Sequence, residues 1–190
     1  YNSNNLKKQL NLEKNFIYVF TGRPGVSKGL EYLIKAVPLI SKMIPNAKLL
    51  AIVSKDKTYE KRYKLIKDLI KKLKIEDKVI LHDPVNYKEL PKYIKLADCV
   101  VIPSLAEGFG FSAAEACAMG KPVIVSNTTS LPEVVSGQYV LVKPKDYEAI
   151  AKGIEMVHEN KTLKKPLKRF LLKENIQNYL KIYKEILKND

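Results

Sequence analysis

Short apolar runs alternate with longer amphipathic segments along most of this chain. Six runs have the length and the β-branched character of buried strands: residues 16–21, 48–53, 79–82, 99–102, 122–125 and 139–142. Each is followed by turn residues and, in most cases, by a helical pattern. Strands that alternate with helices predict a parallel sheet with helices on both faces. The expected fold class is α/β, with a Rossmann-like, doubly wound, six-stranded sheet.

Helical periodicity fills the gaps between the predicted strands. Residues 28–44 place Leu30, Leu33, Ile34 and Val37 at spacings of three and four, which predicts one apolar stripe packed on a sheet face. Residues 59–74 repeat the pattern, and residues 111–119 read as a helix of small side chains. Residues 1–14 and 160–168 lack such periodicity, so we expect connecting segments there.

Length, charge and cysteine content limit the possible functions. With 190 residues, of which 46% are hydrophobic, the chain can bury one substantial core. A formal net charge of +14 favours anionic partners. Cys99 and Cys117 lie in apolar runs, as reduced thiols do, so a cytoplasmic setting is expected. No stretch reaches the roughly 18 apolar residues of a membrane span, so we expect at most peripheral contact with a membrane.

Ligands of an open parallel sheet bind outside the carboxyl ends of its strands, which directs attention to the loops there. After the first predicted strand, Gly22 and Gly25 enclose Arg23, and Lys28 follows where a helix should begin. A helix N-terminus, an arginine fork and a lysine charge together suit a diphosphate. Solvated surface cations are the alternative explanation of this pair.

The same loop invites comparison with the phosphate-binding loop of NTPases, G-x-x-x-x-G-K-[ST]. Ser27 stands where the second glycine should be, and Gly29 stands where a magnesium-binding hydroxyl is needed. The motif does not match.

The loop after the fourth predicted strand contains two carboxylates, Glu107 and Glu115, separated by seven residues. Gly108 and Gly110 between them allow backbone N–H groups to approach an anion closely. We place Glu115 in the alanine-rich first turn of the following helix, where the helix dipole stabilises it and where a ribose diol could supply hydrogen-bond donors. Exposure to solvent is the other explanation of Glu115.

Residues 108–113 also fit G-x-G-x-x-A, the dinucleotide fingerprint, so an NAD-type Rossmann module is an alternative. That fingerprint belongs after the first strand and needs an acidic residue after the second. Here the strand is the fourth, and Asn127 follows the next one. In the loop that contains Asn127, Ser130 and Glu133 have the spacing of a helix capping box, and this loop is a candidate wall of the pocket.

Together and in this order, these motifs resemble the C-terminal domain of retaining GT-B glycosyltransferases of family 4, in the glycosyl transferases group 1. The resemblance rests on Gly22-Arg23 with Lys28-Gly29, on the stretch from Pro103-Ser104 through Glu107-Gly-Phe-Gly to Glu115, and on Gly120-Lys-Pro-Val and Leu131-Pro-Glu. It covers nearly the whole chain. It implies half of a GT-B fold, with residues 1–14 as a linker from an N-terminal acceptor-binding domain, residues 15–160 as the donor-binding domain, and residues 161–190 as a basic segment and closing helix.

The resemblance also implies roles for individual residues. Arg23 and Lys28, beside Gly22, would contact the diphosphate of a UDP-, GDP- or ADP-linked sugar, and Glu115 would contact the ribose. Glu107 and the backbone of Gly108, Phe109, Gly110 and Phe111 would hold the transferred sugar, with Glu107, Lys28 and Arg23 as catalytic residues. Ser104 is also expected to bind the donor. Val85, in one of two turns that depart from the family pattern (54–56 and 82–85), would flank the base. His82 beside it is either a pocket residue or a strand-end histidine without a chemical role.

The sequence offers no Asp-x-Asp pair and no His/Cys cluster with metal spacing, so we expect metal-independent transfer without a further cofactor. The expected partners are a nucleotide sugar and the N-terminal domain, without which the chain should not transfer sugar. Basic stretches at 55–78 and 160–188 make an anionic membrane surface a further candidate. Nucleic acid is not expected, because these stretches lack an aromatic stacking platform. A nucleotide-binding regulatory module is the remaining alternative.

Overall fold

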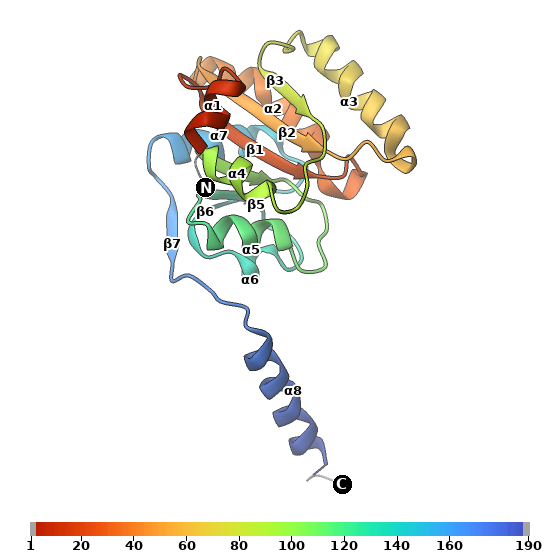
Figure 1. Cartoon of the computed structure of the whole chain (residues 1–190), viewed down its shortest axis with the longest axis vertical. Helices are drawn as coiled ribbons and strands as arrows, with labels where there is room; N and C mark the ends of the chain where they lie inside the picture. Colours follow the sequence, from red (N-terminus) through yellow and green to blue (C-terminus); the bar gives the residue numbers. More distant parts are fainter. Residues whose placement is uncertain (1–2, 188–190) are drawn as a thin grey trace.

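The computed structural model describes residues 3–187 and places all strands in one seven-stranded sheet, in the order β3-β2-β1-β4-β5-β6-β7 (Figure 1). Neighbouring strands pair in parallel except β6 and β7. The parallel strands are β1 (Phe16–Gly22), β2 (Ala47–Val53), β3 (Val79–His82), β4 (Cys99–Ile102), β5 (Val123–Ser126) and β6 (Gly137–Val142). The predicted strands and the doubly wound fold class are confirmed, with strand ends shifted by a few residues.

The strand order reverses direction between β1 and β4. From β1 the chain builds outward through β2 to β3, and then returns to place β4 on the other side of β1. Such a reversal is the point at which doubly wound sheets bind ligands. The loops that follow β1 and β4 therefore meet where a crevice is expected.

A seventh strand, β7 (Leu163–Lys165), corrects the expectation of a plain connecting segment at 160–168. It pairs antiparallel with the start of β6, and Gly137 lies opposite Lys165. All three residues of β7 are exposed. Because this edge strand is short and lysine-rich, it carries no alternating apolar pattern from which it could have been predicted.

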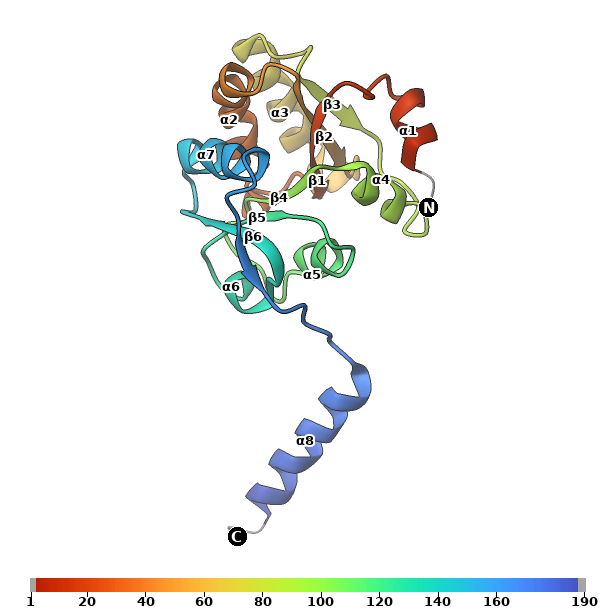
Figure 2. The ribbon, with the colours of Figure 1, turned by 90° about the vertical axis from the view of Figure 1, so that its left-hand side faces the viewer.

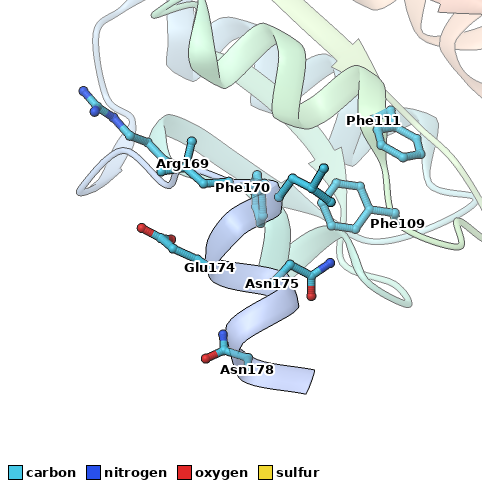
Figure 3. A pocket seen from close by; sticks show the side chains of 9 residues that line it. Phe109, Phe111, Arg169, Phe170, Glu174, Asn175 and Asn178 are labelled. Atoms are coloured by element: carbon cyan, nitrogen blue, oxygen red, sulfur yellow. The ribbon is translucent and has the colours of Figure 1, made fainter. Parts of the chain in front are cut away.

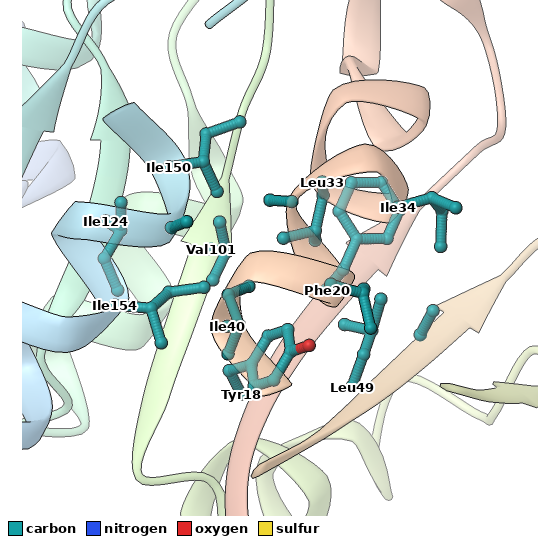
Figure 4. Close-up of a cluster of buried hydrophobic side chains, with 14 of the residues drawn as sticks. Tyr18, Phe20, Leu33, Ile34, Ile40, Leu49, Val101, Ile124, Ile150 and Ile154 are labelled. Atoms are coloured by element: carbon teal, nitrogen blue, oxygen red, sulfur yellow. The ribbon is translucent and has the colours of Figure 1, made fainter. Parts of the chain in front are cut away.

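Side chains alternate between the two faces of the sheet and build two hydrophobic layers. Tyr18 and Phe20 of β1 pack under α2 (Leu30–Met43), α3 (Glu60–Leu73) and α7 (Tyr147–His158) (Figure 4). Ile17 and Val19 pack under α4 (Leu90–Leu96), α5 (Phe111–Ala118) and α6 (Leu131–Val134). Figure 2 shows α2 and α7 on one side of the strands and α4 and α5 on the other. Helices on both faces explain why the strands are apolar throughout.

The segment at 1–14, expected to be a linker, contains a helix that packs on the domain. Helix α1 (Ser3–Gln9) lies against α4. Leu6 and Leu10 are partly buried, and Leu12 is fully buried in the layer under α4 and α5. These leucines explain the packing, since each removes apolar surface from water.

The last helix, α8 (Leu172–Ile186), projects away from the sheet (Figures 1 and 2). Its apolar residues Ile176, Tyr179 and Tyr183 are each at least half exposed. In the part of the chain that the structure describes, no helix combines the length and apolar character needed to cross a membrane.

Both cysteines are free and buried, Cys99 in β4 and Cys117 in α5. Burial raises the pKa of both thiols above the usual range, since a thiolate is poorly solvated in the core. They act as small apolar side chains, in agreement with the sequence.

Candidate functional site

The loop after β1 and the loop after β4 are in direct contact at the point where the strand order reverses. The Leu105 N–H donates to the Ser27 carbonyl at 2.7 Å. Gly29 has a φ of +66°, and a Cβ built there would lie 1.9 Å from the carbonyl oxygen of Pro103. Only glycine allows this approach. Gly29 also ends the short 3-10 turn η1 (Val26–Lys28), so the helix predicted from residue 28 begins at Leu30.

An ion pair between Lys28 and Glu107 joins the two loops. The Lys28 Nζ lies 2.7 Å from Glu107 Oε1, and their side chains are 24% and 12% exposed. The Ser104 hydroxyl donates to the same oxygen at 2.7 Å. Ser104 is itself only 1% exposed. Its hydroxyl therefore positions Glu107 and lies behind the surface that a bound ligand could touch.

Arg23 and Lys28 line one hollow of about 340 Å³ at the carboxyl ends of β1 and β2. Gly22, Val85 and Ser112 lie on its wall. The Arg23 guanidinium is 5.8 Å from the centre of the Tyr59 ring, which is within cation-π range. Among the described residues Arg23 forms no ion pair, so its charge is available to an anion.

Helix α5 starts at the same hollow. Gly110 precedes it with a φ of +98°, and no side chain caps it in the described structure. A Cβ at Gly110 would come within 2.8 Å of Leu131, so this turn also needs glycine. Uncapped N–H groups and the helix dipole favour an anion at this end, and Ser112 in the first turn reaches the hollow.

The loop after β5 supports the β4 loop from behind. The backbone N–H of Glu107 donates to Thr129 Oγ1 at 3.0 Å, and Thr129 adopts an unusual φ of +45°. Ser130 donates to the carbonyl of Phe109 at 2.8 Å and forms no cap bond with α6. The predicted Ser130/Glu133 capping box is therefore wrong, because the hydroxyl is used to hold the glycine-framed loop.

Glu115 is the fifth residue of α5, so the predicted position in the first turn is wrong. Its carboxylate accepts a hydrogen bond from the Tyr87 hydroxyl at 3.0 Å, which raises the pKa of Tyr87. The two side chains lie beside a hollow of about 250 Å³ that shares Leu90 with the Arg23 hollow. Arg23 and Lys28 therefore line one hollow and Glu115 lines the neighbouring one, with Leu90 common to both.

His82 is a strand-end histidine with both ring nitrogens engaged. Nε2 lies 3.2 Å from the Tyr93 hydroxyl, and Nδ1 lies 2.7 Å from the Asp83 carbonyl. The second of the two explanations, a histidine without a chemical role, fits this arrangement. In the turns after β2 and β3, Lys55 pairs with Asp83.

The side chains of Phe109 and Phe111 lie elsewhere. They line a separate hollow with residues 169–172 and the start of α8, whereas the backbone of their loop leads to the uncapped end of α5 (Figure 3). Gly108 is open, since a Cβ there would meet no atom within 4 Å.

Sequence patterns missed two residues of this site, Tyr87 and Ser112, and included Thr129 only as part of the loop expected to form a wall of the pocket. The only available signal for Ser112 is its spacing of three from Glu115, which places both on one helix face. Tyr87 is a single aromatic in a polar loop, and Thr129 is recognisable only from its backbone angle.

The chain is similar to known glycosyltransferases. The family model described as "Glycosyl transferases group 1" matches residues 2–179. An uncharacterized glycosyltransferase of Methanocaldococcus jannaschii is 40% identical over 142 residues, which is 73% of this chain and 35% of the relative.

Two solved structures share the fold. Sucrose-phosphate synthase from Thermosynechococcus elongatus is 29% identical, with a TM-score of 0.74 over 83% of this chain and 40% of that chain. HepE from Anabaena, in complex with UDP and glucose, is 24% identical, with a TM-score of 0.76 over 83% of this chain and 42% of that chain. The chain therefore spans less than half the length of these proteins.

Proposed function

Because this chain belongs to the glycosyl transferases group 1 family, we propose that it binds the nucleotide-sugar donor for transfer of a hexosyl unit to a glycan or lipid-linked acceptor. The observation that carries the proposal is the joined pair of loops at the reversal of the strand order. It presents three features to one hollow: Arg23, which has no ion pair within residues 3–187, the Lys28–Glu107 pair, and the end of α5 that no described side chain caps. We call these loops, 22–29 and 103–110, the phosphate end.

The charge distribution of the phosphate end suits cleavage of a sugar-diphosphate bond. As that bond breaks, negative charge develops on the diphosphate, and fixed donors that face it lower the barrier. Arg23 supplies a forked cation and Lys28 a point charge. In our proposal these two cations take the part that a divalent ion plays elsewhere, so transfer is metal-independent.

Glu107 and Glu115 have separate roles in this proposal. Glu107 is held by Lys28 and Ser104 beside the glycine-framed loop, where its second oxygen can accept hydrogen bonds from hydroxyls of the transferred sugar. Glu115 lines the neighbouring hollow, which shares Leu90 with the Arg23 hollow, and in our proposal it accepts hydrogen bonds from the ribose diol. We propose retention of the anomeric configuration on the family resemblance alone.

The turns after β2 and β3, residues 54–56 and 83–87, form what we call the base end. Ser54, Pro84 and Val85 line the Arg23 hollow there. UDP is the first nucleotide to test, because HepE shares this fold and its structure is of a complex with UDP and glucose.

The rest of the enzyme completes the reaction in our proposal. The chain covers only 35% to 42% of the proteins compared above, so we place the acceptor on an N-terminal domain that precedes it. The chain alone should bind nucleotide but not transfer sugar. A nucleotide-binding regulatory module would stay inactive even when joined to that domain, so complementation separates the two functions.

Calorimetric titration with UDP, GDP and ADP tests the donor proposal. We expect one site per chain and a clear preference for one base, with binding unchanged in EDTA. If none of the three nucleotides bound, the donor proposal would fail. If UDP bound only with a divalent ion present, the roles given to Arg23 and Lys28 would be wrong.

Contact with an anionic membrane is a separate proposal, supported by the basic outer face of α3. Lys61, Lys64, Lys67 and Lys71 are exposed there, and such a face attracts anionic headgroups. Co-pelleting with anionic liposomes at low and high salt tests it. Equal pelleting with neutral liposomes would contradict an electrostatic attachment.

A further inference from the structure

A separate hollow, of about 570 Å³, lies between the glycine-framed loop and the start of α8 (Figure 3). This volume falls within the roughly 300–1,000 Å³ of small-molecule pockets. One part of its wall is aromatic and comes from Phe109, Phe111 and Phe170. It shares no lining residue with the Arg23 hollow. Nothing in the donor proposal uses it.

The three aromatic rings leave faces open. The Phe109 ring contacts both of the others. Its centre lies 4.9 Å from the centre of the Phe111 ring, with an angle of 49° between the ring planes, and 5.0 Å from the centre of the Phe170 ring, with an angle of 83°. In an edge-to-face contact, the ring that contributes its edge keeps both of its faces free of the partner ring. Phe111 is 71% exposed and Phe170 is 52% exposed. Two large aromatic residues at one hollow indicate a surface that a partner covers.

Polar side chains of α8 and of the segment before it also line the hollow. Figure 3 shows Asn175 projecting from the helix beneath Phe109, whereas the charged ends of Arg169 and Glu174 point away from the rings. The Asn175 amide both donates and accepts hydrogen bonds. An apolar protein surface or a lipid chain over the rings would leave this amide without a partner, which is costly.

We propose that this hollow is an additional subsite for one sugar ring of the acceptor glycan, separate from the main acceptor site that we place on the N-terminal domain. A hexose ring has C–H groups, which carry partial positive charge and stack on aromatic faces, and a rim of hydroxyls that both donate and accept. The hollow presents both kinds of partner. This inference rests on the donor proposal for its place in the reaction. The backbone of the 108–111 loop would hold the transferred sugar, and the side chains of Phe109 and Phe111 would contact the acceptor.

The wall formed by Phe170 is held by the sheet as well as by ring contacts. Strand β7 pairs with β6, and Leu167 approaches Gly137 so closely that a Cβ there would lie 3.1 Å from it. Lys168 then donates to the Glu133 carbonyl at the end of α6. These contacts bring residue 170 to the glycine-framed loop even though α8 projects away.

Saturation-transfer NMR on the whole chain tests the subsite with methyl glycosides of glucose, mannose, galactose and N-acetylglucosamine, and with short gluco- and manno-oligosaccharides. We expect millimolar binding of at least one of these sugars, with transfer to the C–H protons of one ring face. Phe170→Ala should weaken it at least fivefold and Asn175→Ala two- to fivefold. Tyr179→Ala, on the same helix but outside the hollow, should leave it unchanged.

Nucleotide binding separates the two proposals. UDP titration should give the same affinity in wild type, F170A and N175A, because neither residue lines the Arg23 hollow. If UDP binds but no sugar of the panel does, or if both variants bind sugar like wild type, the acceptor subsite is wrong while the donor proposal stands. The N175A variant keeps the test valid if F170A does not fold.

Discussion

The two ends of the crevice are built in different ways. At the phosphate end, a partly buried ion pair, a buried serine and a glycine pressed against a carbonyl fix Lys28 and Glu107 in place. At the base end, the Lys55–Asp83 pair is largely exposed, and Tyr87 is 73% exposed. In our proposal the rigid end faces the diphosphate, which UDP-, GDP- and ADP-linked sugars share, whereas the exposed end faces the base, which differs between these donors.

The largest expected effect of a single substitution comes from the rigid end. Gly29→Ala would force a Cβ to 1.9 Å from the Pro103 carbonyl at a φ of +66°. The β1 and β4 loops would have to separate, so we expect a loss of roughly 2–4 kcal/mol in the free energy of unfolding. Chemical denaturation measures it.

Gly108→Ala is the matched control for Gly29→Ala, because it lies in the partner loop with no atom within 4 Å of the added Cβ. We expect it to change stability by about 0.5 kcal/mol or less. Equal effects of the two substitutions would mean that the loops are not pressed together as described.

The next largest effect is a change in nucleotide affinity, which should differ between substitutions at the phosphate end and at the base end. Arg23→Ala removes the exposed, unpaired cation of the phosphate end, so UDP, GDP and ADP should all lose affinity by the same factor. A charge-assisted hydrogen bond at an exposed site suggests roughly tenfold. Val85→Ala at the base end should instead change the ratio between the three nucleotides. Calorimetry measures both, with Lys152→Ala on α7 as the control for loss of a surface charge.

Unequal losses among the three nucleotides in the Arg23 variant would contradict the division of the crevice into two ends. So would a uniform loss in the Val85 variant.

The sequence was most informative about the rigid end. Each functional residue of this end follows a strand closely in the sequence: Arg23, Lys28, Glu107 and the glycines beside them. A parallel sheet brings the carboxyl ends of its strands together, and this holds for loops of any conformation. The periodicity of 28–44 likewise located α2 to within two residues at its start. These predictions rest on local patterns and on one topological rule.

What the sequence did not predict depends on contacts between distant residues. Ser130 has the spacing of a capping residue, yet its hydroxyl bonds to Phe109 because the β5 and β4 loops lie side by side. Strand β7 exists because β6 offers it an edge, and α1 packs because α4 offers its leucines an apolar surface. No local periodicity encodes these neighbours.

The smallest effect concerns the hydrogen bond between Tyr87 and Glu115, which occupies the carboxylate that we assign to the ribose. Tyr87→Phe keeps the ring and removes the competing hydroxyl, so UDP should bind roughly two- to fivefold more tightly. Inorganic pyrophosphate has no ribose and should bind the variant and the wild type equally. The gain should vanish in Tyr87→Phe combined with Glu115→Ala. If Tyr87→Phe weakened UDP binding instead, Tyr87 would be a ligand of the nucleotide, and the exposed base end would be more preorganised than its contacts indicate.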